Sequence, residues 1–337
     1  MPHPIPVGGH RAFQHIKVKE LHSTFGAEIS GVDFASHVSE KVFAEILKAV
    51  NIYGVVVFRK TGLNDDGHVA LGRRFGELDD VKPYIAAGRK NRLKHDELFD
   101  VSNLEIDGSL LKPDSARAFS CKGNSFFHSD SSFNPRRAGY SLLLAHELPP
   151  PETGGNTEFA DTRTAFDDLP SNLKDDLLSK DYIAQHSQWH SRKLAAPDFY
   201  AQTEPLDYFM SRHRLVQKHE ASGRMNLYIA SHIHHLEGLE RDNTLLAKLY
   251  EHAKQPKYVL TISWDSPGDL VIWDNTCTMH RSAGGTFAYT HRRDMRRVTV
   301  HDGSSLAWGF NDPTAERQGM PPLDAEKGTS SLVMVYL

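Results

Sequence analysis

The chain has little cysteine and no long hydrophobic run. Its 337 residues include two cysteines, Cys121 and Cys277, which are too few for a disulfide framework and lack the spacing of a zinc site. We expect two reduced, partly buried thiols. Residues 1–13 lack the apolar segment of a secretory signal, and apolar runs such as 55–58 are too short to span a bilayer. The sequence therefore predicts a cytoplasmic protein that does not enter membranes.

A large excess of one charge is also absent. The formal net charge is -4, from 39 Lys and Arg against 43 Asp and Glu, and this balance does not favour nucleic acid as a partner. Hydrophobic residues at 39% and charged residues at 24% are typical of a globular protein with a sizeable core. The length fits one large domain or two ordinary ones.

Hydrophobic patterns predict helices in the first part of the chain and short strands in the second. Before residue 79 we expect an extended segment at 27–34, a helix over 42–50 capped by Ser39, a strand at 53–58, and a helix from Asn64 through Arg74. After residue 123 we expect strands at 140–146, 225–230 and 296–300, a helix at about 242–253, and a hairpin of 258–264 with 269–273. This order favours one α+β domain, residues 1–337, built around a β-sandwich or jelly roll.

Two segments have weak periodicity. Residues 79–123 are charged and contain Gly and Pro, and we predict a long irregular insertion there. Long loops in compact domains often serve as lids or binding loops, so this insertion is a candidate lid. The tail, residues 302–337, has no pattern from which we predict structure.

The arrangement His-x-Asp or His-x-Glu followed by a distant histidine is typical of a mononuclear iron(II) site. Two imidazoles and one carboxylate occupy one face of the ion and leave the other for co-substrate and dioxygen. Three such pairs begin at His95, His128 and His235, and a chain with 20 histidines produces matches by chance. His95 lies in a charged run and His235 in a histidine cluster. In contrast, His128 and Asp130 lie in an extended, apolar-flanked segment that directs both to one side.

The third ligand should come from a neighbouring strand with a cation close behind it. His280 follows the β-like run 270–274 and precedes Arg293 and Arg297, which alternate onto one face of the last predicted strand. Arginine suits a carboxylate because its planar fork donates two parallel hydrogen bonds. A solvated basic patch at 292–297 is the alternative. Whether Arg292 or Arg293 would bind the carboxylate stays open.

Four motifs together resemble the dichlorophenoxyacetate dioxygenase and taurine dioxygenase family. They are residues 123–133 (GNSFFHSDSSF), 154–161 (GGNTEFAD), 273–281 (WDNTCTMHR) and 293–297 (RDMRR). The first half of the chain agrees, so the resemblance covers about residues 25–300. It implies a mainly β fold with flanking helices, a double-stranded β-helix or jelly roll of the cupin-like barrel type, with the iron at its mouth.

The resemblance also implies roles for single residues. It matches His128, Asp130 and His280 to the iron ligands. It matches Thr157 and Arg293 to groups that bind 2-oxoglutarate, Arg297 to an arginine near both co-substrate and substrate, and Asn124 to an amide of the substrate pocket. We add His232, from the cluster at 231–235, as a candidate substrate contact.

The implied activity is that of a dioxygenase that depends on Fe(2+), 2-oxoglutarate and O2. It would hydroxylate a small anionic or carboxylate-bearing substrate and release succinate and CO2. Desaturation, ring closure or purine hydroxylation on the same scaffold are alternatives, as is a non-catalytic barrel that binds a metal or an anion. The oligomeric state stays open, with a homodimer as the working expectation.

Overall fold

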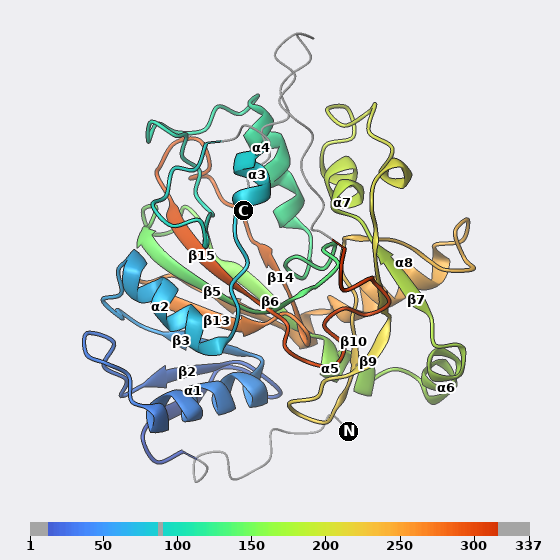
Figure 1. The fold of residues 1–337 in the computed structure, drawn as a ribbon, viewed down its shortest axis with the longest axis horizontal. Coiled ribbons are helices and arrows are strands. Elements are labelled where there is room, and N and C mark those ends of the chain that lie inside the picture. Colours follow the sequence, from blue (N-terminus) through green and yellow to red (C-terminus); the bar gives the residue numbers. More distant parts are fainter. Residues whose placement is uncertain (1–12, 87–89, 316–337) are drawn as a thin grey trace.

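A computed structural model describes residues 13–86 and 90–315 of the chain (Figure 1). Four sheets are present among them. The seven-stranded sheet has the order β1 (Lys17–Glu20), β2 (Ala27–Ser30), β3 (Val55–Phe58), β13 (Leu270–Asp274), β5 (Ala138–Glu147), β15 (Asp294–His301) and β4 (Leu98–Asp100). A three-stranded sheet has the order β12 (Val259–Ile262), β6 (Thr157–Asp161) and β14 (Thr278–Ser282). The others are β11 (Ile233–Leu236), β7 (Ile183–His186) and β8 (Ser211–Arg214), and the pair β10 (Met225–Leu227) and β9 (Val216–Lys218).

Helices cover the outer side of the large sheet and surround the other end of the protein (Figure 1). They are α1 (Glu40–Tyr53), α2 (Asp65–Phe75), α3 (Lys82–Ala86), α4 (Ala116–Cys121), α5 (Thr162–Asp167), α6 (Ser171–Lys180), α7 (Gln188–Ala195) and α8 (Thr244–Ala253), with 3-10 turns η2 (Lys122–Ser125), η3 (Pro205–Asp207) and η4 (Pro256–Tyr258). None of these helices is long and apolar enough to cross a membrane.

The large sheet is buried on both faces because its side chains alternate between two cores. On β5, Leu142 and Leu144 pack with the apolar residues of α1 and α2. Leu143 and Ala145 point the other way and pack against Phe159 of β6. The β12-β6-β14 sheet therefore lies against the inner face of the large sheet, and the space between the two sheets is where the site is built.

Local signals predicted the N-terminal elements well. Ser39 caps α1 by accepting a hydrogen bond from the Val42 N–H, and Asn64 caps α2 in the same way. The predicted strands at 53–58, 140–146 and 296–300 and the helix near 242–253 are present as β3, β5, β15 and α8. The segment 225–230 forms only the short strand β10.

Two expectations about the middle and the end of the chain are wrong. Strands β12 and β13 do not form a hairpin, because β12 pairs with β6 whereas β13 pairs with β3 and β5. The turn between them carries the chain from one sheet to the other. The insertion at 79–123 is not irregular throughout, since it contains α3, α4, η2 and β4, which pairs with β15. Most of the tail, from residue 316 onward, lies outside the described residues.

Candidate active site

The three predicted metal ligands converge between the two packed sheets. The backbones of His128 and His280 form an isolated antiparallel bridge, with N–H to carbonyl distances of 2.9 and 2.8 Å. The chain turns after Asp130, where Ser131 adopts a left-handed φ of 48°. One ligand atom from each of His128, Asp130 and His280 lies within 4.8 Å of the others, and all three residues are buried. Residues 152 positions apart in the chain are thus brought to one point.

The protonation states in this cluster are those that a divalent metal needs. Burial lowers the pKa of His128, and it lowers the pKa of His280 to about 3, so both imidazoles are neutral. Burial alone would raise the pKa of Asp130, but the guanidinium of Arg297 and the hydrogen bond from Ser141 hold it below its ordinary value. Metal binding requires neutral histidine and ionised carboxylate. The cluster supplies that donor set, and the residues therefore fit a metal ion.

Hydrogen bonds orient the ligands. The His128 Nδ1 lies 2.8 Å from the Phe126 carbonyl, which fixes the tautomer that leaves Nε2 with a lone pair. Ser141 donates to the Asp130 carboxylate at 2.7 Å, and Asn275 in turn donates to the Ser141 hydroxyl at 2.9 Å. The Asn275 side-chain oxygen accepts from the Asp130 N–H at 3.0 Å. The carboxylate is therefore held at both its backbone and its side chain.

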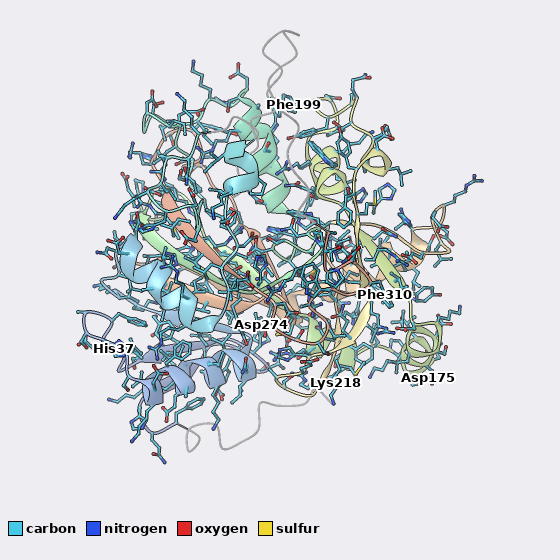
Figure 2. All side chains as sticks on the ribbon, viewed as in Figure 1. His37, Asp175, Phe199, Lys218, Asp274 and Phe310 are labelled. Atoms are coloured by element: carbon cyan, nitrogen blue, oxygen red, sulfur yellow. The ribbon has the colours of Figure 1, made fainter. Side chains whose placement is uncertain are left out.

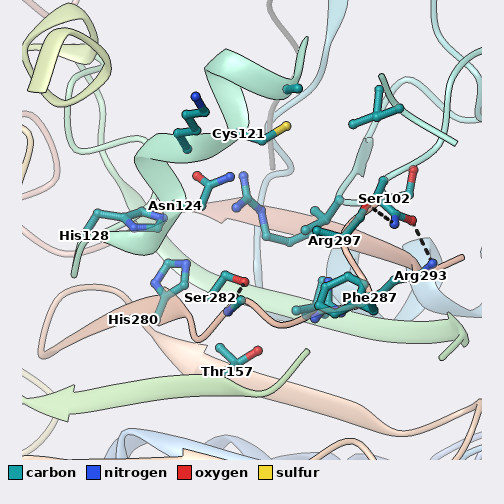
Figure 3. A pocket seen from close by; sticks show the side chains of 18 of the residues that line it. Ser102, Cys121, Asn124, His128, Thr157, His280, Ser282, Phe287, Arg293 and Arg297 are labelled. Atoms are coloured by element: carbon teal, nitrogen blue, oxygen red, sulfur yellow. Dashed lines mark hydrogen bonds between the residues drawn. The ribbon is translucent and has the colours of Figure 1, made fainter. Parts of the chain in front are cut away.

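A cavity of about 220 Å³ opens beside the cluster (Figure 3). His128, His280, Asn124, Thr157, Arg293 and Arg297 line it, together with apolar side chains of the insertion and of β5 and β13. The Thr157 hydroxyl in the cavity wall accepts a hydrogen bond from the Trp264 indole at 3.1 Å. The cavity thus brings the predicted co-substrate residues to the metal cluster, and the insertion forms part of its wall.

Arg293 is a buried cation in this cavity. Its guanidinium donates to the Gly155 carbonyl at 3.1 Å, while its Nε has no hydrogen-bond partner among the described residues. Burial lowers its pKa to about 10, and no described carboxylate compensates for that burial. Arg292 differs, because it is half exposed and pairs with Glu147 at 2.9 Å. Only Arg293 of the two presents its charge to the cavity.

Two glycines, Gly154 of the GGNT motif and Gly285, allow two loops to meet beside Arg293. Gly154 and Gly285 form a bridge, with φ values of 98° and 155°. A Cβ on Gly154 would lie 2.5 Å from the Gly284 carbonyl oxygen, and one on Gly285 would lie 2.2 Å from the Thr153 carbonyl oxygen. Glycine is therefore required at both positions. This contact holds the strand that begins at Thr157 against the loop that leads to Arg293.

The remaining predicted residues lie close to the cluster. Arg297 contacts the Asp130 carboxylate directly and also donates to Thr299 at 3.1 Å. Asn124, in η2, lines the cavity beside His128. His232 is buried, and its ring centre lies 5.5 Å from that of His128. This histidine therefore lies inside the protein rather than on its surface.

The comparisons with known proteins identify the family. Residues 17–299 match the family described as "Taurine catabolism dioxygenase TauD, TfdA family". The chain belongs to this family. An alpha-ketoglutarate-dependent 2,4-dichlorophenoxyacetate dioxygenase of Burkholderia sp. (strain RASC) is 36% identical over 288 residues, covering 85% of this chain and 94% of the relative. The enzyme of the same description from Cupriavidus pinatubonensis is 36% identical over 285 residues, covering 84% of this chain and 96% of the relative.

A solved structure agrees. The crystal structure of AAD-2 in complex with Mn(II) and N-oxalylglycine has 34% sequence identity and a TM-score of 0.79, and the match covers 87% of this chain and 100% of that one. The predicted enzyme class is confirmed: this TauD/TfdA family member is a dioxygenase dependent on α-ketoglutarate, or 2-oxoglutarate, with a metal-binding triad. The mixed α+β fold is confirmed with it.

The rival histidine motifs do not assemble a site in this dioxygenase. His95 lies on the surface and contacts Asp66 at 2.6 Å. His235 contacts the ring of His234 at 2.8 Å between Nδ1 atoms. Neither belongs to a potential metal-binding group among the described residues. Both cysteines are free, and Cys277 is fully buried whereas Cys121 is partly exposed.

A second buried cluster joins His219, Asp274 and Cys277, whose potential ligand atoms also lie within 4.8 Å of one another. Figure 2 labels Asp274, which is buried near the end of β13. His219 contacts Asp274 through Nε2 at 2.9 Å and Ser222 through Nδ1 at 2.6 Å. Both ring nitrogens are therefore already engaged, and this cluster is a closed hydrogen-bonded pair.

The residues that support the triad were not predicted from the sequence. Ser141 and Asn275 lie on or next to strands, where a polar residue has no local signal of its role. Asn275 does belong to the WDN segment of the resemblance, and a polar residue between buried strands could have been suspected. The face of α7 that borders the cluster was not predicted either. The segment 188–195 is short and polar, and its hydrophobic residues show no clear helical periodicity.

Proposed function

We propose that this enzyme uses iron(II), 2-oxoglutarate and O2 to hydroxylate a small carboxylate-bearing substrate of the aryloxyalkanoic acid type. The 2,4-dichlorophenoxyacetate named for its relatives supports this class. When bound, the iron and the keto acid activate dioxygen and deliver one oxygen to a substrate C–H bond, with release of succinate and CO2. Desaturation and ring closure are different outcomes of the same chemistry, and product analysis separates them.

The observation that carries this proposal is the buried charge of Arg293. A guanidinium buried in a cavity wall without a carboxylate among the described residues is costly unless an anion joins it. The far carboxylate of 2-oxoglutarate is such an anion, and Arg293 would bind it with two parallel hydrogen bonds. Thr157 would add a hydroxyl to the same carboxylate.

His128, Asp130 and His280 would hold the iron on one face. Their neutral and ionised states match its needs, and the hydrogen bonds from Ser141 and to Phe126 keep them in place. Arg297, which contacts Asp130, would balance the charge of the site between co-substrate and substrate. The buried walls would exclude water from the reacting atoms.

The substrate would lie on the insertion side of the cavity. Asn124 and His232 border the metal cluster, and we propose that both contact the substrate. The apolar lining from Val101, Leu111 and Ala118 suits an aromatic or aliphatic body. These three residues belong to the insertion at 79–123, which we propose acts as the lid over the substrate.

At the level of the whole chain, we propose one catalytic domain, residues 1–337, with a core at about 25–300 and a tail from about 302. The two packed sheets would form the double-stranded β-helix, or jelly roll, expected of a cupin-like barrel. A cytoplasmic location and a homodimer stay predictions. Size-exclusion chromatography with light scattering tests the dimer.

The test is anaerobic addition of Fe(II) and 2-oxoglutarate, followed by 2,4-dichlorophenoxyacetate and oxygen. We expect the visible charge-transfer band of the keto-acid chelate, then equal amounts of succinate and 2,4-dichlorophenol. The phenol forms because hydroxylation beside the ether oxygen gives a hemiacetal that breaks down to phenol and glyoxylate. Succinate without any substrate-dependent increase would leave the cofactor chemistry standing and reject this substrate class.

A matched pair of variants tests the co-substrate assignment. Arg293→Ala should raise the KM for 2-oxoglutarate by roughly tenfold to a hundredfold, the scale of a lost charged hydrogen bond, and leave the KM for the acid nearly unchanged. Arg292→Ala removes a neighbouring, half-exposed arginine and should change neither KM. An unchanged co-substrate KM in Arg293→Ala would reject the assignment.

A further inference from the structure

A second, smaller cavity lies beside the metal cluster. Its volume is about 40 Å³, and Asn124, His128 and Arg297 line both it and the larger cavity. Arg293 lines the larger cavity and is absent from the lining of the smaller one. The two cavities therefore meet at the metal cluster and extend from it to different sides.

One face of α7 forms the far wall of the small cavity. Gln188, Ser191 and Arg192 line it, and their spacing of three and four residues places them on the same side of the helix. All three are more than nine-tenths buried. The Gln188 Nε2 has no hydrogen-bond partner among the described residues. A buried amide donor without an acceptor is unfavourable, so this wall fits an acceptor that the described residues do not supply.

The charge of the lining points to an anionic acceptor. Arg192 and Arg297 contribute two positive charges and Asp130 one negative charge, and Asp130 already contacts Arg297. The lining of the small cavity therefore has one more positive than negative charge, even before a metal ion binds.

The sizes of the two cavities separate what each can hold. About 40 Å³ is far below the roughly 150 Å³ of an engineered cavity that binds benzene, which leaves room for a carboxylate and none for an aromatic ring. The larger cavity, with about 220 Å³ and apolar walls, can hold the body of an organic acid.

We propose that Arg192 and Gln188 bind the carboxylate of the substrate, on the opposite side of the metal cluster from the Arg293 that binds the co-substrate. This inference rests on the proposed function and adds to it the residues that select an acid. Because the carboxylate would lie directly beside His128 and Asp130, the carbon attached to it is the one nearest the metal. The site would therefore oxidise next to the carboxylate and would discriminate against neutral analogues.

The test uses enzyme loaded with Mn(II) and N-oxalylglycine, which has the skeleton of 2-oxoglutarate with an NH in place of one CH2. Calorimetric titration then compares 2,4-dichlorophenoxyacetate with its neutral primary amide, with no turnover. The wild type should bind the acid more tightly than the amide. Arg192→Gln should lower the affinity for the acid by roughly tenfold to a hundredfold and change the affinity for the amide little. The preference for the acid should therefore disappear. Gln188→Leu should reduce the preference by a smaller factor.

Two further variants complete the design. Arg192→Lys keeps the charge and should retain most of the preference for the acid. Arg241→Gln removes an exposed arginine of the surface and should behave as the wild type. If Arg192→Gln does not fold, Gln188→Leu decides by the same acid-to-amide ratio.

The outcomes separate this inference from the function on which it rests. Failure of the wild type to bind Mn(II) and N-oxalylglycine would reject the proposed function. Suppose that all variants bind Mn(II) and N-oxalylglycine. An unchanged ratio of acid affinity to amide affinity in Arg192→Gln would then overturn the role of Arg192 and leave the proposed function standing. A wild type without preference for the acid also overturns it. In steady state, the supporting result is a raised KM for the acid with an unchanged KM for 2-oxoglutarate.

Discussion

Two buried clusters each offer three potential metal ligands whose ligand atoms lie within 4.8 Å of one another. The first cluster is His128, Asp130 and His280, and the second is His219, Asp274 and Cys277. Both are buried, and adjacent residues even link them, since Asp274 belongs to the second cluster while Asn275 supports the first. They differ in whether their ring nitrogens are available. Both nitrogens of His219 are engaged in hydrogen bonds, whereas the Nε2 of His128 keeps a lone pair. This difference decides which of the two can accept a metal.

In the second cluster the histidine is charged and satisfied. Burial alone would lower the pKa of His219, but Cys277 and Asp274 raise it to about 10. In the first cluster the imidazoles are neutral and the carboxylate is ionised. Residue types and burial therefore do not define a metal site; protonation states and the direction of the hydrogen bonds do.

Removal of a ligand should have the largest effect. Asp130→Ala or His280→Ala should lower succinate formation at least about a thousandfold, because the ligands act as a unit. His219→Gln should keep turnover within a few-fold of the wild type wherever the protein is folded. Succinate release at saturating 2-oxoglutarate measures both. Equal losses from the two clusters would remove the distinction between them.

Loss of Asp274 should chiefly affect stability. Asp274→Ala leaves the buried positive charge of His219 without its partner, which should lower the free energy of unfolding by about 3–5 kcal/mol. Urea unfolding of the metal-free protein measures it. Asp176→Ala, at an exposed pair with Lys180, is the matched control and should cost less than about 0.5 kcal/mol. Similar values for both variants would mean that the buried pair contributes nothing.

Loss of Ser141 should weaken the metal without removing it. Ser141→Ala deletes the hydroxyl that donates to the Asp130 carboxylate at 2.7 Å and should lower metal affinity by roughly tenfold to a hundredfold. Ser179→Ala, on the exposed end of α6, is the control. Competition with a chelator of known affinity gives the value. An unchanged affinity would show that the carboxylate needs no support.

The second cluster should also show a pH dependence. The pKa of His219 rises from 6.5 to about 10 on folding, so its contribution to stability is complete below pH 6.5 and is lost as the pH rises through 10. The difference in unfolding free energy between wild type and His219→Gln should therefore shrink between these two pH values. Urea titrations of the metal-free proteins measure it, and a difference that grows with pH would contradict the charge assigned to His219.

The sequence predicted those parts of the fold that depend on local signals. The caps Ser39 and Asn64 and the buried run of β3 are local, and each was found. The hairpin of β12 and β13 was wrong because nothing within the turn between them says which sheet each strand joins. That choice depends on the partners β6 and β5, which lie about a hundred residues or more earlier.

The site divides in the same way. His128, Asp130 and His280 were predicted because their motifs keep order and spacing. Ser141 and Arg192 were not, because their roles depend on strands and helices that only the fold brings to the metal cluster. Apart from their places in the fold, a serine in a strand and an arginine in a helix carry no distinguishing signal.

The most direct measurement counts bound Mn(II) per chain by the electron paramagnetic resonance signal of the free ion. Wild type and His219→Gln should each bind a single tight ion, and Asp130→Ala should bind none. A tight ion retained by Asp130→Ala, or one lost on changing His219 in a folded protein, would place the metal elsewhere and contradict the account.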